Sequence, residues 1–122
     1  MKNIVIAAFC MIMSISVNAE EKTLSKDEAQ ALFSNKTFDG INEEEGKSFQ
    51  VYSSADGVHN LKKANGKMKQ GTWSIDNKGR HCIEFGRKKC ASVVTDGSGV
   101  YKKMRHGEVT HTLKNFVDGD QL

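Results

Sequence analysis

Two cysteines, Cys82 and Cys90, are near enough in the sequence to act together as a metal site, a redox site or a disulfide. Structural zinc takes four ligands and usually has two to four residues between paired cysteines, whereas seven residues separate these two. A thioredoxin-type redox site needs C-x-x-C at the start of a helix, and this segment lacks that motif. We therefore interpret the pair as a structural disulfide.

Three histidines, His59, His81 and His111, fall on stretches where apolar residues alternate. Imidazoles that point inward from three strands can bind a metal ion or line a small polar pocket. No pair has the H-E-x-x-H spacing of a helical zinc site, so we predict a pocket and no metal.

Trp73 alternates with Gly71, and we interpret it as a core residue packing over a glycine. The alternative is that Trp73 stacks on a ligand in the same pocket.

Signatures of catalysis are missing from the sequence. It has no G-x-S-x-G, no phosphate-binding loop and no nucleophile–base pattern. It also has no convincing pair of carboxylates, and the run Glu43–Glu45 is typical of a solvated loop. We predict that the protein is not an enzyme and needs no cofactor.

Charge is distributed unevenly along a chain whose formal net charge is +3. From Glu20 to Asp56 there are nine acidic and four basic residues, and from Gly57 to His106 there are twelve basic and three acidic residues. If the hairpin ends gather at one rim of the fold, their bases form a patch suited to an anionic partner. The residues proposed for this patch are Lys62, Lys63, Arg87, Lys88, Lys89, Lys102, Lys103 and Arg105.

The N-terminus resembles a secretory signal peptide. Lys2 precedes an apolar run, and Val17-Asn18-Ala19 offers small residues at the −3 and −1 positions of a cleavage site. The run is shorter than the ~20 residues that a membrane-spanning helix needs. We therefore predict cleavage after Ala19 and a periplasmic or secreted protein that does not span the membrane. Cys10 is removed with the signal, and the remaining even pair suits an oxidising compartment.

The mature chain, residues 20–122, is predicted to fold as a single all-β domain after a short helix. Ser25 and Glu28 form an S-x-x-E capping box before an apolar segment, which indicates a helix over about Lys26–Phe33. After Lys36, regularly spaced Asn and Gly turns separate short stretches of period-two alternation. This pattern predicts an antiparallel meander that forms a small barrel of seven or eight strands, lipocalin-like or calycin-like.

Cys82 and Cys90 are equidistant from Gly86 and should lie opposite each other across one hairpin. Alternation places His81 and Ile83 on the apolar face, so the disulfide is expected on the other face, outside the core.

Several motifs carry a resemblance. They are T-F-D-G from Thr37, F-Q-V-Y from Phe49, G-T-W-S-I-D-N-K-G-R-H-C from Gly71, a second Cys at 90 and D-G-S-G-V-Y from Asp96. The chain resembles small exported proteobacterial domains of unknown function that carry a G-x-W, a D-x-x-G turn and paired cysteines. That resemblance implies a small β-barrel and supplies no catalytic residues. A weaker likeness is to periplasmic inhibitors of lysozyme and proteases. Ser98-Gly99-Val100-Tyr101 is similar to an S-G-x-x-Y element, with one residue where that family has two between Gly and Tyr.

Together these features predict an exported, non-catalytic binding protein for a small molecule, apolar ligands included, or for an anionic envelope component. The alternative is an inhibitor of an exported hydrolase, a lysozyme or a protease, that inserts the Asp96–Gly99 turn into the active site of the enzyme. Export argues against a nucleic-acid partner.

Overall fold

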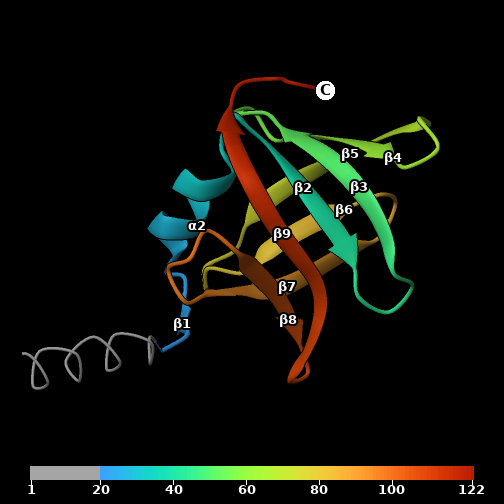
Figure 1. The fold of residues 1–122 in the computed structure, drawn as a ribbon. Coiled ribbons are helices and arrows are strands. Elements are labelled where there is room, and N and C mark those ends of the chain that lie inside the picture. Colours follow the sequence, from blue (N-terminus) through green and yellow to red (C-terminus); the bar gives the residue numbers. More distant parts are fainter. Residues whose placement is uncertain (1–19) are drawn as a thin grey trace, which may run out of the picture.

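The computed structural model describes residues 20–122, and the signal-peptide prediction lies outside this range. Within this range, one short helix and nine strands follow one another (Figure 1). Their bounds are β1 Lys22–Thr23, α2 Lys26–Phe33, β2 Lys36–Asn42, β3 Lys47–Ser53, β4 Val58–Lys63, β5 Met68–Ile75, β6 His81–Glu84, β7 Lys88–Thr95, β8 Tyr101–Arg105 and β9 Glu108–Asp118.

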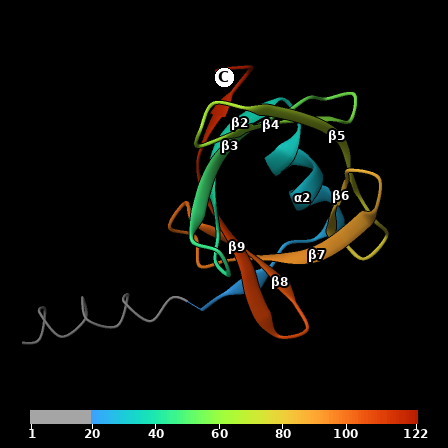
Figure 2. The same cartoon turned by 90° about the vertical axis from the view of Figure 1, so that its right-hand side faces the viewer.

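Strands β2 to β9 form a closed antiparallel barrel. Each strand pairs with the next one in sequence, and β9 returns to pair with β2, so the sheet has no free edge among these eight strands. Figure 2 shows the ring from the end opposite α2, with the helix visible at the far end. The short β1 pairs with β7, Lys22 opposite Thr95. The predicted meander barrel of seven or eight strands is confirmed, with eight strands in the ring.

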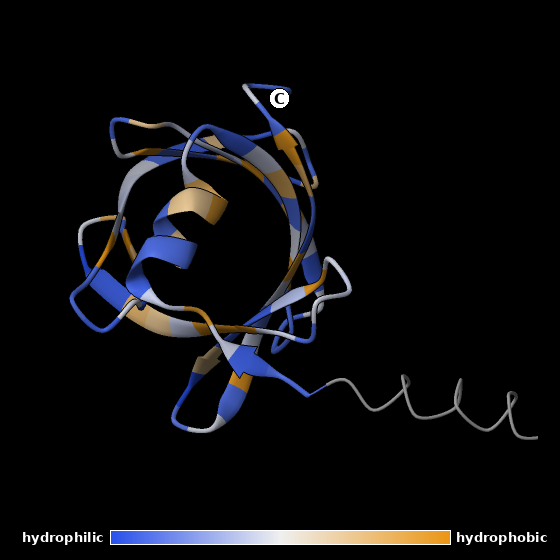
Figure 3. Ribbon diagram, turned by 90° about the vertical axis from the view of Figure 1, so that its left-hand side faces the viewer, coloured by the Kyte–Doolittle hydropathy of each residue, from blue (hydrophilic) through white to orange (hydrophobic). Residues whose placement is uncertain are grey.

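Helix α2 begins at the predicted capping box. The Glu28 amide donates to Ser25 Oγ at 3.2 Å, and the Ser25 amide donates to Glu28 Oε1 at 2.9 Å, so two amides at the helix start are satisfied. The helix turns Ala29 and Phe33 inward, and both side chains are fully buried. In Figure 3 the helix lies within one end of the ring, whose strands change between hydrophilic and hydrophobic residues along their length. No helix within residues 20–122 is long and apolar enough to cross a membrane.

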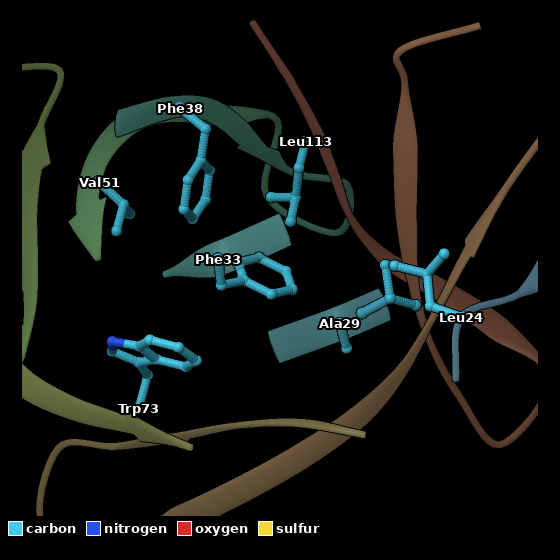
Figure 4. Packing of buried hydrophobic residues seen from close by; sticks show 8 residues of the cluster. Leu24, Ala29, Phe33, Phe38, Val51, Trp73 and Leu113 are labelled. Carbon is cyan, nitrogen blue, oxygen red and sulfur yellow. The ribbon is translucent and has the colours of Figure 1, made fainter. Parts of the chain in front are cut away.

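The core fills this helical end of the barrel around the Phe33 ring (Figure 4). Phe33 contacts Phe38 edge-on, with ring centroids 5.6 Å apart, and lies 6.2 Å from Trp73. On another side it stacks on His81 with 3.8 Å between centroids and 9° between planes. The imidazole of His81 therefore bounds the apolar core on this side.

Phe116 joins this core because β9 has a bulge at Asn115. The pairing with β2 shifts register between Thr37 and Asp39, and Asn115 takes a positive φ of 59°. A bulge changes which face the following residue presents. Leu113 and Phe116 can therefore both face inward, and Phe116 stacks on Phe38 at 4.6 Å between centroids.

Cys82 and Cys90 are directly paired across the β6–β7 hairpin and form a disulfide, as the sequence predicts. The sequence predicts that the disulfide lies outside the core, and the structure differs from this prediction in one respect. Cys82 is only 1% exposed, because the turn that follows β5 brings the Asp76 carboxylate within 4.8 Å of both sulfurs. Asp76 is itself held there by an ion pair with Arg80, 2.7 Å from oxygen to nitrogen.

We expect replacement of both cysteines by alanine to lower the free energy of unfolding by about 2–3 kcal/mol. This is the loop-closure entropy of a short cross-linked loop, here with a sequence separation of 8. Urea unfolding of the variant, followed by Trp73 fluorescence, measures the change. Equal midpoints for the variant, the oxidised protein and the reduced protein would show that the bridge does not stabilise the fold.

Candidate functional site

The end of the barrel opposite α2 is open and leads into a cavity of about 1440 Å³. Small-molecule sites usually have about 300–1,000 Å³, and this volume is larger because it includes the open mouth. The mouth is formed by four turns, namely 43–46, 64–67, 85–87 and 106–107. The inward faces of the strands form the wall, and His81, stacked on Phe33, lies at the boundary with the core.

Two aromatic rings lie along the cavity wall over glycines of the neighbouring strands. A Cβ at Gly71 would lie 2.6 Å from the Phe85 ring and would also meet the Glu84 carbonyl oxygen. A Cβ at Gly40 would likewise overlap the ring of Phe49, its partner in the β2–β3 ladder. Because glycine has no side chain, each ring can rest on the adjacent backbone and leave the centre of the barrel open.

On the same wall, four nitrogen-bearing side chains form what we call the polar girdle: His59, His81, Lys103 and His111. They come from β4, β6, β8 and β9, and all four line the cavity. His59 and His81 are 4% and 1% exposed. Their buried atoms His59 Nδ1, His81 Nδ1 and His81 Nε2 have no hydrogen-bond partner among the described residues.

The three girdle histidines are neutral at pH 7. Burial, and then the charge of Lys103, lower the pKa of His59 to about 3 and that of His111 to about 4. Burial lowers the pKa of His81 well below its usual range. The unfolded chain takes up protons below about pH 6.5 that these folded imidazoles do not. We therefore expect the fold to lose stability as the pH falls below that value.

Lys103 lies inside the barrel and not on the rim, where its place in the basic segment predicts it. It pairs with His111 across the β8–β9 ladder, two residues from the inward pair of Tyr101 and Leu113, and it is 8% exposed. Burial, and then Arg105, lower its pKa to about 7. Within residues 20–122 its ammonium group forms no ion pair.

The other bases of the predicted patch divide between two faces of the wall. Lys63, Arg87, Lys89 and Arg105 line the mouth of the cavity, whereas Lys62, Lys88 and Lys102 do not. Lys102 instead pairs with Glu21, 3.1 Å from nitrogen to oxygen. The mouth also carries four acidic residues, listed here in chain order: Glu43, Glu44, Glu45 and Glu108. It is therefore a ring of mixed charge and not a uniformly positive patch.

Trp73 and Cys82 lie outside the candidate site, whereas Cys90 is among the residues that line the cavity. Trp73 is a core residue whose indole Nε1 donates to the Ser54 carbonyl at 2.8 Å, and it does not line the cavity. Among the residues that the structure describes, Asp76, Cys82 and Cys90 form the one cluster with metal-ligand geometry. Both sulfurs of that cluster are in the disulfide, so it offers no thiolate to a metal.

The fold and the site define a closed antiparallel barrel with one end filled by a helix and the other open to a partly polar cavity. Comparison with protein-family models, curated proteins and solved structures finds no match for this chain. The resemblance to small exported domains stays a prediction from sequence motifs.

We expect Lys103→Met to stabilise the protein near pH 7 by at least about 1 kcal/mol, or roughly 4–8 °C in Tm. The pKa of Lys103 is lowered to about 7 from 10.5. Between these values the unfolded chain holds a proton that the folded chain releases, so the cost of burying Lys103 falls as the pH rises. The stabilisation should therefore be smaller at about pH 10. Thermal melts at both pH values measure it.

Lys102→Met is the matched control, since Lys102 is the neighbouring residue on β8 and lies off the cavity wall. Its Tm should change little at either pH, as is usual for an exposed ion pair. A Lys103→Met variant that is less stable than the parent at both pH values would contradict the buried, unpaired ammonium.

Proposed function

We propose that the protein is an exported, non-catalytic binding protein that takes a small molecule into the open end of its barrel. The observation that carries this proposal is the polar girdle on the wall of an open cavity, in which the buried nitrogens His59 Nδ1, His81 Nδ1 and His81 Nε2 have no hydrogen-bond partner among the described residues. A buried polar atom without a partner costs about 1–3 kcal/mol. Side chains that only supported the fold would avoid this cost by being apolar.

The composition of the cavity wall suits a ligand with both polar and apolar parts. Beside the girdle, Phe49, Leu61, Ile83 and Phe85 supply apolar contact surface on the cavity wall. The girdle itself supplies hydrogen-bond donors and acceptors that can fix the orientation of a bound molecule. A largely apolar pocket with a few convergent polar groups is the usual form of a small-molecule site.

Export is supported by two features. The first 19 residues have the pattern of a cleavable signal, and a structural disulfide is typical of proteins outside the cytoplasm. A non-catalytic role is supported by the girdle, where His111 Nδ1 contacts Thr110 Oγ1 at 2.9 Å and no carboxylate is hydrogen-bonded to a girdle imidazole among the described residues. An anionic envelope component bound at the mouth, and inhibition of a hydrolase through Asp96–Gly99, stay predictions from the sequence.

Filling the cavity tests the proposal. We expect Leu61→Trp, which adds bulk on the cavity side of β4, to reduce binding of the neutral fluorescent probe N-phenylnaphthylamine by about tenfold or more, because overfilled sites exclude ligands. Asn60→Trp adds the same bulk at the neighbouring position, which does not line the cavity, and should bind the probe like the parent. Probe fluorescence titration gives both affinities, and thermal melts show that both variants are folded.

Native mass spectrometry of the protein purified from its own cell envelope provides a second test that needs no chosen probe. A molecule that co-purifies with the parent and with Asn60→Trp but not with Leu61→Trp supports the proposal and gives the mass of the ligand. An empty parent protein that also fails to bind the probe would exclude a small-molecule role.

A further inference from the structure

We propose that the ligand is an amphipathic monocarboxylate that enters head first, with its carboxylate on Lys103 and its apolar body against the aromatic wall near the mouth. This inference rests on the proposed function and names the chemical class of the molecule that binds.

The charge of the ligand head follows from the charges inside the barrel. Lys103 is the one cationic side chain of the girdle, because the histidines around it are neutral. A buried charge is strongly unfavourable unless it is paired, and the described residues supply no carboxylate that pairs with this one. A ligand with a single negative charge neutralises Lys103, whereas a dianion would leave one charge unpaired in the same buried region.

The neutral histidines favour an oxygen acid as the head group. A neutral imidazole carries one N–H donor, and His81 presents two unpartnered nitrogens while His59 presents one. A carboxylate has two oxygens and about four acceptor positions. One oxygen can therefore accept from the Lys103 ammonium while the other accepts from imidazole N–H groups, which satisfies buried donors from several strands at once.

The body of the ligand is set by the wall between His81 and the mouth. From His81 to Phe85 the β6 side of the wall spans four residues, or about 13 Å at ~3.3 Å per residue. Its inward side chains are Ile83 and Phe85, with Leu61 and Phe49 contributed by other strands. A body of medium length and apolar character covers this wall and leaves the mixed charges of the mouth in water.

The surroundings of Lys103 make binding depend on pH. The charged and titratable groups that face it are Arg105 on its own strand, His111 on β9, and His59 and His81 across the barrel. Glu43, at the mouth, acts on His111, and Lys89 on β7 adds further positive charge there. With a pKa of about 7, Lys103 is largely neutral at about pH 9, so each carboxylate bound there must bring a proton with it.

The test compares dansylaminoundecanoic acid with its methyl ester, which is neutral and nearly identical in shape. At about pH 6 the acid should bind about tenfold or more tightly than the ester, the effect expected of one charge-assisted hydrogen bond in a buried site. By about pH 9 affinity for the acid should fall by about tenfold to a hundredfold, while affinity for the ester stays constant. Fluorescence titration measures all four dissociation constants.

Lys103→Met should bind the ester as the parent does but lose the preference for the acid and its pH dependence. Lys102→Met, changed at the adjacent residue, should keep both. Retained ester binding by Lys103→Met shows that the variant is folded and its cavity open.

Three results would overturn the inference. If acid and ester bind the parent equally, the head-group assignment fails while the proposed function stands. If Lys103→Met keeps the preference for the acid, the carboxylate is held elsewhere, for example by cations of the mouth. If neither probe binds, both the assignment and the small-molecule function fail.

Discussion

The Phe33 ring, carried by α2 into one end of the barrel, is the contact on which the two halves of the interior depend. It packs edge-on against Phe38 and Phe116 and stacks face to face on His81. Without it the barrel would be open at both ends, since the strands alone form only the wall. Because one bulky aromatic closes the helical half, apolar core and open cavity can coexist in a chain of this length. The capping box fixes where the helix starts and so where Phe33 points.

In the cavity half of the barrel, buried polar side chains lower the stability of the fold and provide groups that can bind a ligand. Interiors usually fill their space with apolar side chains, yet here three imidazoles and a lysine occupy the middle of the barrel. Each of them has its pKa lowered by burial, which shows that the fold opposes their charged forms. Such a cost is typical of functional sites. The aromatic rings over Gly40 and Gly71 also favour ligand binding, because they provide apolar contact surface without filling the centre of the barrel.

Features encoded locally could be predicted from the sequence, and features set by pairing across the barrel could not. The capping box of α2, the glycine turns and the Cys82–Cys90 pairing each depend on residues within one turn or hairpin. Lys103 was assigned to the surface because lysine is almost always exposed, and only its pairing with His111 reveals that it faces inward. Phe116 was missed because the bulge at Asn115 interrupts the period of two. The inward histidines were found because their neighbours alternate, but whether they enclosed a cavity depended on the closure between β9 and β2.

The disulfide matters to the site, and one of its two cysteines, Cys90, is among the residues that line the cavity. Strand β6 is the shortest in the ring, with four residues, and the turns on either side of it leave few ladder hydrogen bonds to hold it. Yet this strand carries His81 at the floor of the cavity and Ile83 on its wall, with Phe85 directly after it. The bridge joins Cys82, between the two inward residues, to β7. A covalent tie at that position keeps both side chains in register, where hydrogen bonds alone would allow a short strand to fray. The disulfide therefore stabilises the wall of the cavity as well as the fold.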